Sequence, residues 1–210
     1  MTPEILSGMV GASLNEQAIS RLSGFAQMVT RWNPRINLIS PGTVPEIWTR
    51  HVADSAQLYR LLPDRAASLV DLGSGGGFPG IVLAILLAAT GRTMKIDLIE
   101  SDRRKAAFLL SALRELDVSA TVHPRRAEEV PPLAAAVVTA RALAPLERLV
   151  PLALRHLDHD GVGIFPKGRQ HMAELALASD EFRVRDIVPS LTDAESAIIM
   201  IERSDHAAVG

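Results

Sequence analysis

Cysteine is absent from this chain of 210 residues. Its absence excludes disulfides, thiolate metal sites, iron–sulfur clusters and cysteine nucleophiles. Aromatic residues are also few, with two tryptophans, one tyrosine and five phenylalanines, so we do not expect a sheet of base-stacking aromatics like that of RNA-recognition modules. The six histidines show no spacing typical of metal ligands, and no metal site is predicted.

Long hydrophobic runs are missing too. The longest, around Ile81–Ala89, is far too short for a membrane span, and the N-terminus lacks the basic and apolar regions of a secretory signal. Acidic residues number 24 and basic residues 22, which gives a formal net charge of −2. Any binding of nucleic acid must therefore come from a local basic face. These features predict a cytoplasmic protein that does not associate with membranes.

The first third of the chain is predicted to be helical. Apolar residues recur at three- and four-residue spacing over Leu14–Arg31, which predicts a helix that Asn33-Pro34 ends. A second helix is predicted over Val44–Leu62, and Pro63 is expected to end it. We expect residues 1–63 to form a small helical N-terminal region and 64–210 to form the main domain.

Short apolar runs alternate with helical patterns in the rest of the chain, which predicts an α/β fold with a parallel sheet wrapped by helices. No helix-length segment separates the last two runs, so we expect them to pair as antiparallel strands. The expected strands are 68–73, 94–100, 119–123, 134–140, 161–165, 182–188 and 197–203, and the expected helices are 80–91, 102–117, 145–156 and 170–178.

A glycine-rich loop follows the first predicted strand and opens a helix. A phosphate-binding loop of the Walker type needs lysine and serine or threonine after its last glycine, and this loop continues with Ile81 instead. A dinucleotide fingerprint places glycine or alanine where this chain has Phe78. The pattern that fits is an acid at Asp71 followed by glycines at Gly73, Gly75 and Gly77, and it resembles motif I of the class I S-adenosylmethionine methyltransferases.

Glu100 closes the second predicted strand. In a parallel sheet this end lies beside the glycine loop, at the carboxyl edge where ligands bind. A carboxylate there can accept hydrogen bonds from both hydroxyls of a ribose, so we assign Glu100 to the cofactor, together with Gly73 and Gly75. Asp102 is the rival acid, and its position predicts a helix N-cap instead.

Several segments together resemble one family within this class. The family is the 16S ribosomal RNA guanine-N7 methyltransferases, first known as glucose-inhibited division protein B. Two of the segments, WNPRINLIS and RHVADS, belong to the N-terminal region of this family and not to methyltransferases in general. The matching segments are 32–40, 50–55, 71–80, 98–109, 126–129, 141–150 and 165–170.

The resemblance implies a Rossmann-like, seven-stranded, mostly parallel sheet with its last strand antiparallel and helices on both faces, behind a small helical N-terminal extension. It implies S-adenosylmethionine as cofactor, which makes 64–210 the methyltransferase domain. Its motif positions place cofactor contacts at Gly73, Phe78, Ala127, Glu128 and Arg141. The family often has other residues at three assigned positions: leucine at 78, valine at 127 and aspartate at 100.

The reaction is narrowed by what the chain lacks. A cytosine-C5 enzyme needs a catalytic cysteine. An enzyme that alkylates an exocyclic amine usually carries an Asn/Asp-Pro-Pro-aromatic loop, where this chain has Thr139–Leu143. Guanine N7 has an available lone pair and needs no deprotonation, so no catalytic acid or base is assigned. Methyl transfer to a small molecule or a protein, a non-catalytic nucleotide-binding protein and an oxidoreductase remain as alternatives.

The expected substrate is 16S rRNA within the small ribosomal subunit, bound by a monomer. Basic residues cluster near loops that the alternation places at the carboxyl edge, where they can hold phosphates. We assign Arg50, His51 and Lys167 to the substrate, although His51 fits a buried helix position equally well. Trp32 and Trp48 are predicted to be packing anchors and not base stackers.

Overall fold

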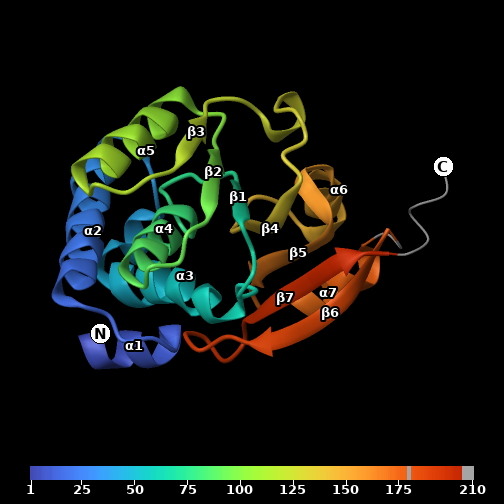
Figure 1. Cartoon of the computed structure of the whole chain (residues 1–210), viewed down its shortest axis with the longest axis horizontal. Helices are drawn as coiled ribbons and strands as arrows, with labels where there is room; N and C mark the ends of the chain where they lie inside the picture. The colour runs from blue at the N-terminus through green and yellow to red at the C-terminus, as the bar shows by residue number, and fades with distance from the viewer. Residues whose placement is uncertain (179–180, 205–210) are drawn as a thin grey trace.

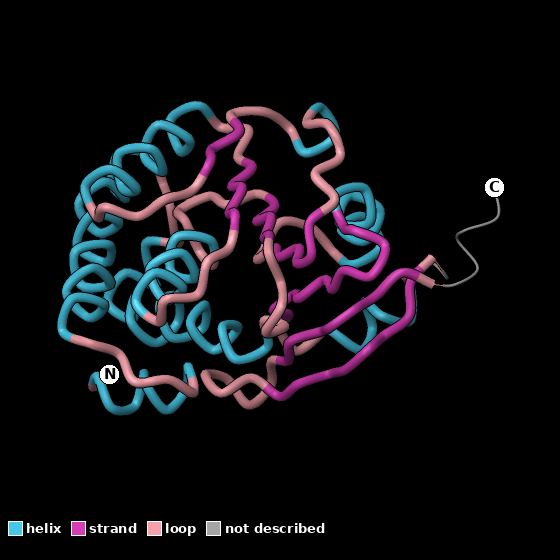
Figure 2. Tube along the Cα trace, in the orientation of Figure 1, coloured by secondary structure: helices cyan, strands magenta, loops and turns pink. Residues whose placement is uncertain are grey.

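The computed structural model describes residues 1–178 and 181–204. A seven-stranded sheet crosses the molecule, with helices on both of its faces (Figures 1 and 2). The strands lie in the order β3-β2-β1-β4-β5-β7-β6, and β7 runs opposite to the other six. This confirms the predicted fold class. The strands are β1 Ser68–Leu72, β2 Lys95–Ile99, β3 Thr121–His123, β4 Ala135–Ala140, β5 Leu157–Lys167, β6 Phe182–Pro189 and β7 Ala197–Arg203.

The helices divide between two hydrophobic cores. One face of the sheet packs against α1, α2, α4, α5 and the irregular helical segment between α2 and β1. The other face packs chiefly against α6. The helices are α1 Pro3–Val10, α2 Glu16–Ile36, η1 Pro41–Glu46, η2 Trp48–Ala53, α3 Asp54–Ala56, η3 Gln57–Leu61, α4 Gly80–Ala89, α5 Arg103–Glu115, η4 Ala127–Glu129, α6 Leu146–His156 and α7 His171–Leu177.

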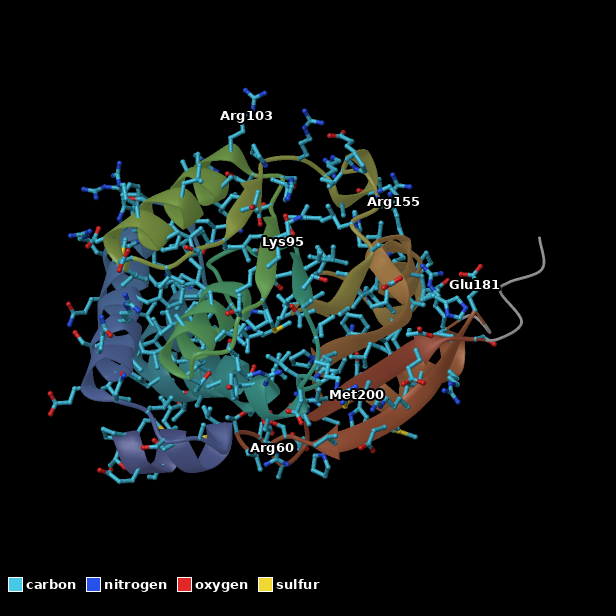
Figure 3. All side chains as sticks on the ribbon, viewed as in Figure 1. Arg60, Lys95, Arg103, Arg155, Glu181 and Met200 are labelled. Atoms are coloured by element: carbon cyan, nitrogen blue, oxygen red, sulfur yellow. The ribbon has the colours of Figure 1, made fainter. Side chains whose placement is uncertain are left out.

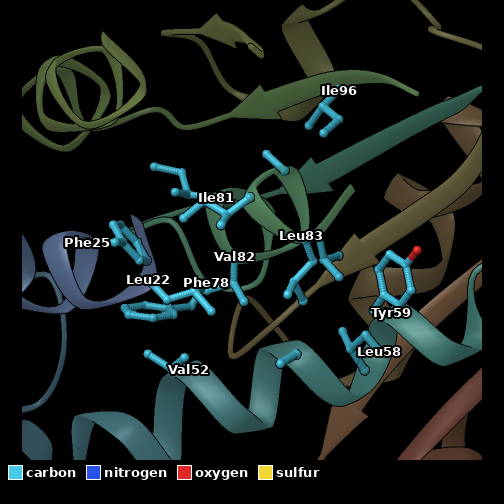
Figure 4. Packing of buried hydrophobic residues seen from close by; sticks show 14 of the residues in the cluster. Leu22, Phe25, Val52, Leu58, Tyr59, Phe78, Ile81, Val82, Leu83 and Ile96 are labelled. Carbon is cyan, nitrogen blue, oxygen red and sulfur yellow. The ribbon is translucent and has the colours of Figure 1, made fainter. Parts of the chain in front are cut away.

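The first core contains residues from both sides of the boundary expected between 63 and 64. Phe25 of α2 lies 5.0 Å from the ring of Phe78, which follows the glycine loop, and Figure 4 shows both among the buried side chains of α4 and η2. Trp32 packs edge-on against Phe108 of α5 at 6.1 Å, as expected of a packing anchor. The N-terminal helices are therefore part of the wall beneath the glycine loop.

The prediction that Asn33-Pro34 ends the helix that begins near Leu14 is wrong, because that helix, α2, continues to Ile36. Pro34 removes one N–H from the helical ladder, but it lies on the exposed side of the last turn, where water can reach the carbonyl left without a partner. The opposite side buries Asn33 and Ile36. Asn37 then ends the helix in the left-handed conformation, with its N–H bonded to the carbonyl of Asn33 at 2.9 Å.

The single helix predicted over Val44–Leu62 is replaced by four short pieces. A 3-10 helix, η1, leads into a π-helix, η2, and then into α3 and a second 3-10 helix, η3. The segment stays helical throughout, but its hydrogen-bond spacing changes at each junction. No helix in the described part of the chain is long and apolar enough to cross a membrane.

Candidate functional site

Strand register brings three of the predicted site residues to one edge of the sheet. Leu72 pairs with Ile99 of β2 on one side and with Ala140 of β4 on the other. The next residues along these strands are Gly73, Glu100 and Arg141. They therefore emerge side by side at the carboxyl edge, where open α/β sheets bind their ligands.

The glycine loop has a backbone that only glycine adopts readily. Gly73, Gly75 and Gly77 have φ angles of +63°, +55° and +87°, all in the left-handed region. A Cβ at Gly75 would meet nothing closer than the carbonyl oxygen of Gly73 at 3.6 Å. The space beside Gly75 is thus open to a ligand.

Asp71 fixes this loop from below. Its side chain is completely buried, and its Oδ2 accepts the N–H of Gly80, the first residue of α4, at 3.1 Å. Its Oδ1 accepts the hydroxyl of Thr139 on β4 at 3.1 Å. Burial raises the pKa of the Asp71 carboxyl to about 7. Asp71 therefore ties β1, β4 and the start of α4 together around the loop.

Glu100 joins the glycine loop to the start of α5. Its Oε2 accepts the N–H of Gly75 at 2.8 Å, and its Oε1 accepts the N–H of Asp102 at 2.7 Å. Only 7% of Glu100 is exposed, so it is not an ordinary solvated acid. Asp102 caps α5 as predicted, through the N–H groups of Arg104 and Lys105.

A cavity of about 1370 Å³ opens over this edge of the sheet. Its walls come from the glycine loop, the segment after β4, the end of β5, η1 to α3, and the turn between β6 and β7. Eight of the residues predicted for the site line it: Gly73, Gly75, Phe78, Glu100, Arg141, Arg50, His51 and Lys167.

Ala127 and Glu128 are not among the residues that line this cavity. They form η4 after β3, and Glu128 is exposed. Ala127 is buried, and its carbonyl oxygen lies 2.9 Å from Nε2 of the buried His156. Their assignment to the cofactor stays a prediction from the resemblance.

Arg141 lies at the centre of a polar network that the sequence did not reveal. Its Nη1 donates to the carbonyl oxygen of Arg50 at 2.9 Å and to Oδ2 of Asp54 at 3.2 Å. Its Nη2 lies 2.6 Å from Nδ1 of His51, and its guanidinium lies 5.3 Å from the centroid of the Phe78 ring. The RHVADS segment therefore surrounds this arginine.

The family model described as GidB, rRNA small subunit methyltransferase G, matches residues 18–198.

The chain belongs to this family.

Several relatives carry the name ribosomal RNA small subunit methyltransferase G. The one from Cereibacter sphaeroides is 44% identical over 194 residues, which cover 92% of this chain and 94% of the relative. The one from Rhodospirillum centenum is 46% identical over 189 residues, covering 90% and 85%. This chain is accordingly an S-adenosylmethionine-dependent methyltransferase of the family.

Solved structures with low sequence identity share the fold. A crystal structure of a mutant of MtNAS has a TM-score of 0.59 at 18% identity and covers 97% of this chain and 82% of that one. A ribosomal protein L11 methylase from Lactobacillus delbrueckii subsp. bulgaricus has a TM-score of 0.56 at 17% identity, covering 74% and 79%. Both support the Rossmann-like methyltransferase architecture.

The residues of the cavity suit the cofactor of this family. The open backbone at Gly75 admits a ligand that a side chain would exclude. Each oxygen of Glu100 accepts one backbone N–H and keeps a lone pair for a ribose hydroxyl. Leu143, which sequence reasoning missed, is 40% exposed inside the cavity and packs over Gly73, where it offers an apolar contact.

Lys167 ends β5 and reaches the cavity with its charge already paired. Its Nζ donates to the carbonyl oxygen of Ala144 at 2.7 Å and to Oε2 of Glu174 at 2.8 Å, and its side chain is 10% exposed. The ammonium is therefore held at the edge of the cavity by the segment after β4 and by α7. Its contact with RNA phosphate stays a prediction.

His51 is a buried, neutral histidine in this family site. Its Nδ1 accepts from Arg141, so the proton is on Nε2, which lies 2.8 Å from the hydroxyl oxygen of Thr43. That hydroxyl in turn donates to the carbonyl of Ser40. Burial, followed by the positive charges of Arg141 and Arg50, lowers the pKa of His51 to about 4.

We expect His51 to make the protein less stable as the solution is acidified. The unfolded chain binds a proton near the ordinary pKa of 6.5, and the folded chain binds it only near pH 4. The stability is therefore fully present above pH 6.5 and is lost as the pH falls from 6.5 to 4. The shift corresponds to about 3 kcal/mol.

Urea unfolding of wild type and His51→Gln at several pH values measures this contribution. The difference between the two proteins isolates His51 from Asp71, whose raised pKa has the opposite effect and lowers stability as the pH rises from about 4 to 7. A wild-type-minus-variant difference that does not shrink on acidification would show that His51 is not held neutral.

Proposed function

We propose that this enzyme transfers the methyl group of S-adenosylmethionine to N7 of a guanine in 16S rRNA of the small ribosomal subunit. The observation that supports this most strongly is the meeting of two sets of residues in one cavity. The first set is Gly73, Glu100 and Arg141, which we assign to the cofactor and which lie at the carboxyl edge of the sheet. Arg50 and His51, from the family's own N-terminal segment, form the facing wall. We further propose that it acts as a monomer in the cytoplasm.

In this reaction the protein aligns the attacking guanine nitrogen with the methyl carbon and the sulfur of the cofactor, and it excludes water from the site. Bound S-adenosylmethionine supplies an electrophilic methyl group. Glu100 and the left-handed glycine backbone orient the cofactor, and Leu143 covers the position above Gly73. Guanine N7 presents a lone pair without prior loss of a proton, so the site needs no general base.

The basic side chains around the cavity hold the RNA backbone in this proposal. Arg50 is exposed, and its Nη1 lies 3.9 Å from Glu46, a loose surface pair that a phosphate can displace. Arg103 points away from the ribbon at the start of α5 (Figure 3), and Lys105 of the same helix lines the cavity. Lys167 lies at the cavity edge, where it can meet a phosphate beside the target guanine.

Replacing Lys167 by alanine should lower kcat/KM for methylation of 30S particles by about tenfold or more, because a buried, oriented ammonium is lost. Binding of S-adenosylhomocysteine should survive. The logarithm of RNA affinity falls with the logarithm of salt concentration, and the variant's slope should be shallower by about one. Single-turnover methylation and RNA titrations at several salt concentrations measure both effects.

The matched control is Lys95→Ala. Lys95 also pairs with an acid, Asp97 at 3.2 Å, but it begins β2 and therefore lies at the opposite edge of the sheet. This variant should methylate at the wild-type rate. An unchanged rate and unchanged RNA affinity in Lys167→Ala would leave that lysine as part of the Glu174 ion pair alone.

The function itself is tested with tritiated S-adenosylmethionine, protein-free 16S RNA and purified 30S particles, followed by mapping of the modified base. Radioactivity at guanine N7 of 16S RNA is the expected result. Methylation of another base, of a ribosomal protein or of a small molecule would overturn the proposal, as would cofactor binding without turnover on either substrate.

A further inference from the structure

Asp54 lies between two walls of the cavity and bonds to both. Its Oδ2 forms an ion pair with Nη1 of Arg141 at 3.2 Å. Its Oδ1 accepts from Nε2 of Gln57 and from the hydroxyl of Thr192, both at 2.9 Å. The side chains of Asp54 and Arg141 are 20% and 16% exposed, so both are largely withdrawn from water.

Asp54 provides the charge that orients Arg141. Among residues 1–178 and 181–204, it is the only carboxylate paired with this guanidinium. The other two partners, the carbonyl of Arg50 and the neutral ring of His51, are uncharged acceptors. Together the three partners use Nη1 and one side of Nη2, while Nε–H and the other Nη2–H take no part in these bonds.

The irregular helical segment between α2 and β1 places all three partners of Arg141 within hydrogen-bond distance of its guanidinium. The carbonyl of Arg50 and the ring of His51 belong to the π-helix η2, and Asp54 begins α3 directly after it. Residues 50, 51 and 54 thus converge on one guanidinium. Wide helical turns of this kind occur frequently at functional sites.

The second oxygen of Asp54 holds the turn between β6 and β7. Thr192 donates to it directly, and Gln57 both donates to it and accepts the N–H of Leu191 at 2.8 Å. Ser190 and Thr192 line the cavity. One carboxylate therefore sets the position of Arg141 and of the opposite rim at the same time.

We propose that Asp54 is a positioning residue for methyl transfer, which acts by fixing the guanidinium of Arg141 toward the bound cofactor. The methylation part of this inference rests on the proposed function, whereas the cofactor-binding part does not. The proposal also gives the N-terminal region a role besides packing against the sheet. This region completes the cofactor site from the side opposite the glycine loop.

A double-mutant cycle between Asp54 and Arg141 tests the proposal. Asp54→Asn keeps an oxygen for Thr192 and Gln57 but turns an NH2 group toward Arg141. We expect it to weaken binding of S-adenosylhomocysteine by about tenfold, the cost of a charge-assisted hydrogen bond, and to lower kcat on 30S particles. Arg141→Gln, which has no charge, should weaken binding at least as much. In the Arg141→Gln background no cation is left for Asp54 to orient, so Asp54→Asn should have no further effect.

Calorimetric binding, single-turnover methylation and thermal unfolding are measured for all four proteins, with the exposed acid Asp64→Asn as control. Additive losses in affinity, or unchanged affinity in Asp54→Asn, would overturn the proposal, because a merely structural role lowers melting temperature without coupling to Arg141. If Asp54→Asn does not fold, Asp54→Ser, which keeps a hydroxyl oxygen but no charge, completes the same cycle. Failure of wild type to methylate 16S RNA would overturn the proposed function. The cofactor affinities of the four proteins would still test whether Asp54 positions Arg141.

Discussion

Gly75→Val should reduce the affinity for S-adenosylmethionine by about a hundredfold or more, close to 3 kcal/mol. Two effects act together. Gly75 has a φ of +55°, which is unfavourable for a β-branched residue. The nearest protein atom to an added Cβ is 3.6 Å away, so the valine side chain fits the protein but occupies the cofactor's space. Isothermal titration calorimetry measures the loss.

Gly91→Val is the matched control. Gly91 has a similar φ of +70°, and an added Cβ there would meet nothing within 4 Å. It follows α4 at the end away from the cavity, so its backbone strain lowers stability without touching the cofactor. Both variants should lose a similar free energy of unfolding, and only Gly75→Val should lose binding. Equal cofactor affinity in the two would contradict the placement of the cofactor against the glycine loop.

The sheet could be predicted from sequence because its signals are local. Each buried strand is a short apolar run, and each crossover helix has its own start, such as Asp102 before α5. The alternation then fixes a parallel sheet, and the short connection between β6 and β7 fixes the one antiparallel strand. The family resemblance added the number of strands and the identity of the cofactor to this predicted fold.

The irregular helices could not be predicted in the same way. Apolar spacing indicates that 44–62 is helical, but it does not distinguish α, 3-10 and π hydrogen bonding, and these differ along η1, η2 and η3. The end of α2 differs from the predicted one for a related reason. Pro34 opposes the helix locally, and the burial of Ile36, which depends on the tertiary fold, outweighs it.

The site residues also fall into a group that the sequence could place and a group that it could not. Gly73, Glu100 and Arg141 could be placed together because strand ends in a parallel sheet meet at one edge. The contacts of Arg141 with His51 and Asp54 join residues about 90 positions apart, and no pattern in the sequence records such a pairing. The pairing of Lys167 with Glu174 was equally hidden, since two charged residues near a loop are usually solvated.

Glu100→Gln should weaken cofactor binding by about tenfold to a hundredfold, the equivalent of 1–3 kcal/mol. The glutamine amide has one oxygen, so it can accept the N–H of Gly75 or of Asp102 but not both. Its NH2 group then faces the remaining N–H donor, and the ribose loses a charged acceptor. Because these bonds also hold the protein together, the free energy of unfolding should fall by about 1–3 kcal/mol.

Asp102→Ala separates the two acids. It removes the side-chain bonds to the N–H groups of Arg104 and Lys105, and the loss of this cap should cost about 1 kcal/mol of stability. The backbone N–H of Asp102 still reaches Glu100, so cofactor affinity should stay at the wild-type value. Calorimetry with S-adenosylhomocysteine and urea unfolding on both variants give the answer. If Asp102→Ala weakens binding and Glu100→Gln does not, the ribose contact belongs to Asp102 and the assignment of Glu100 is wrong.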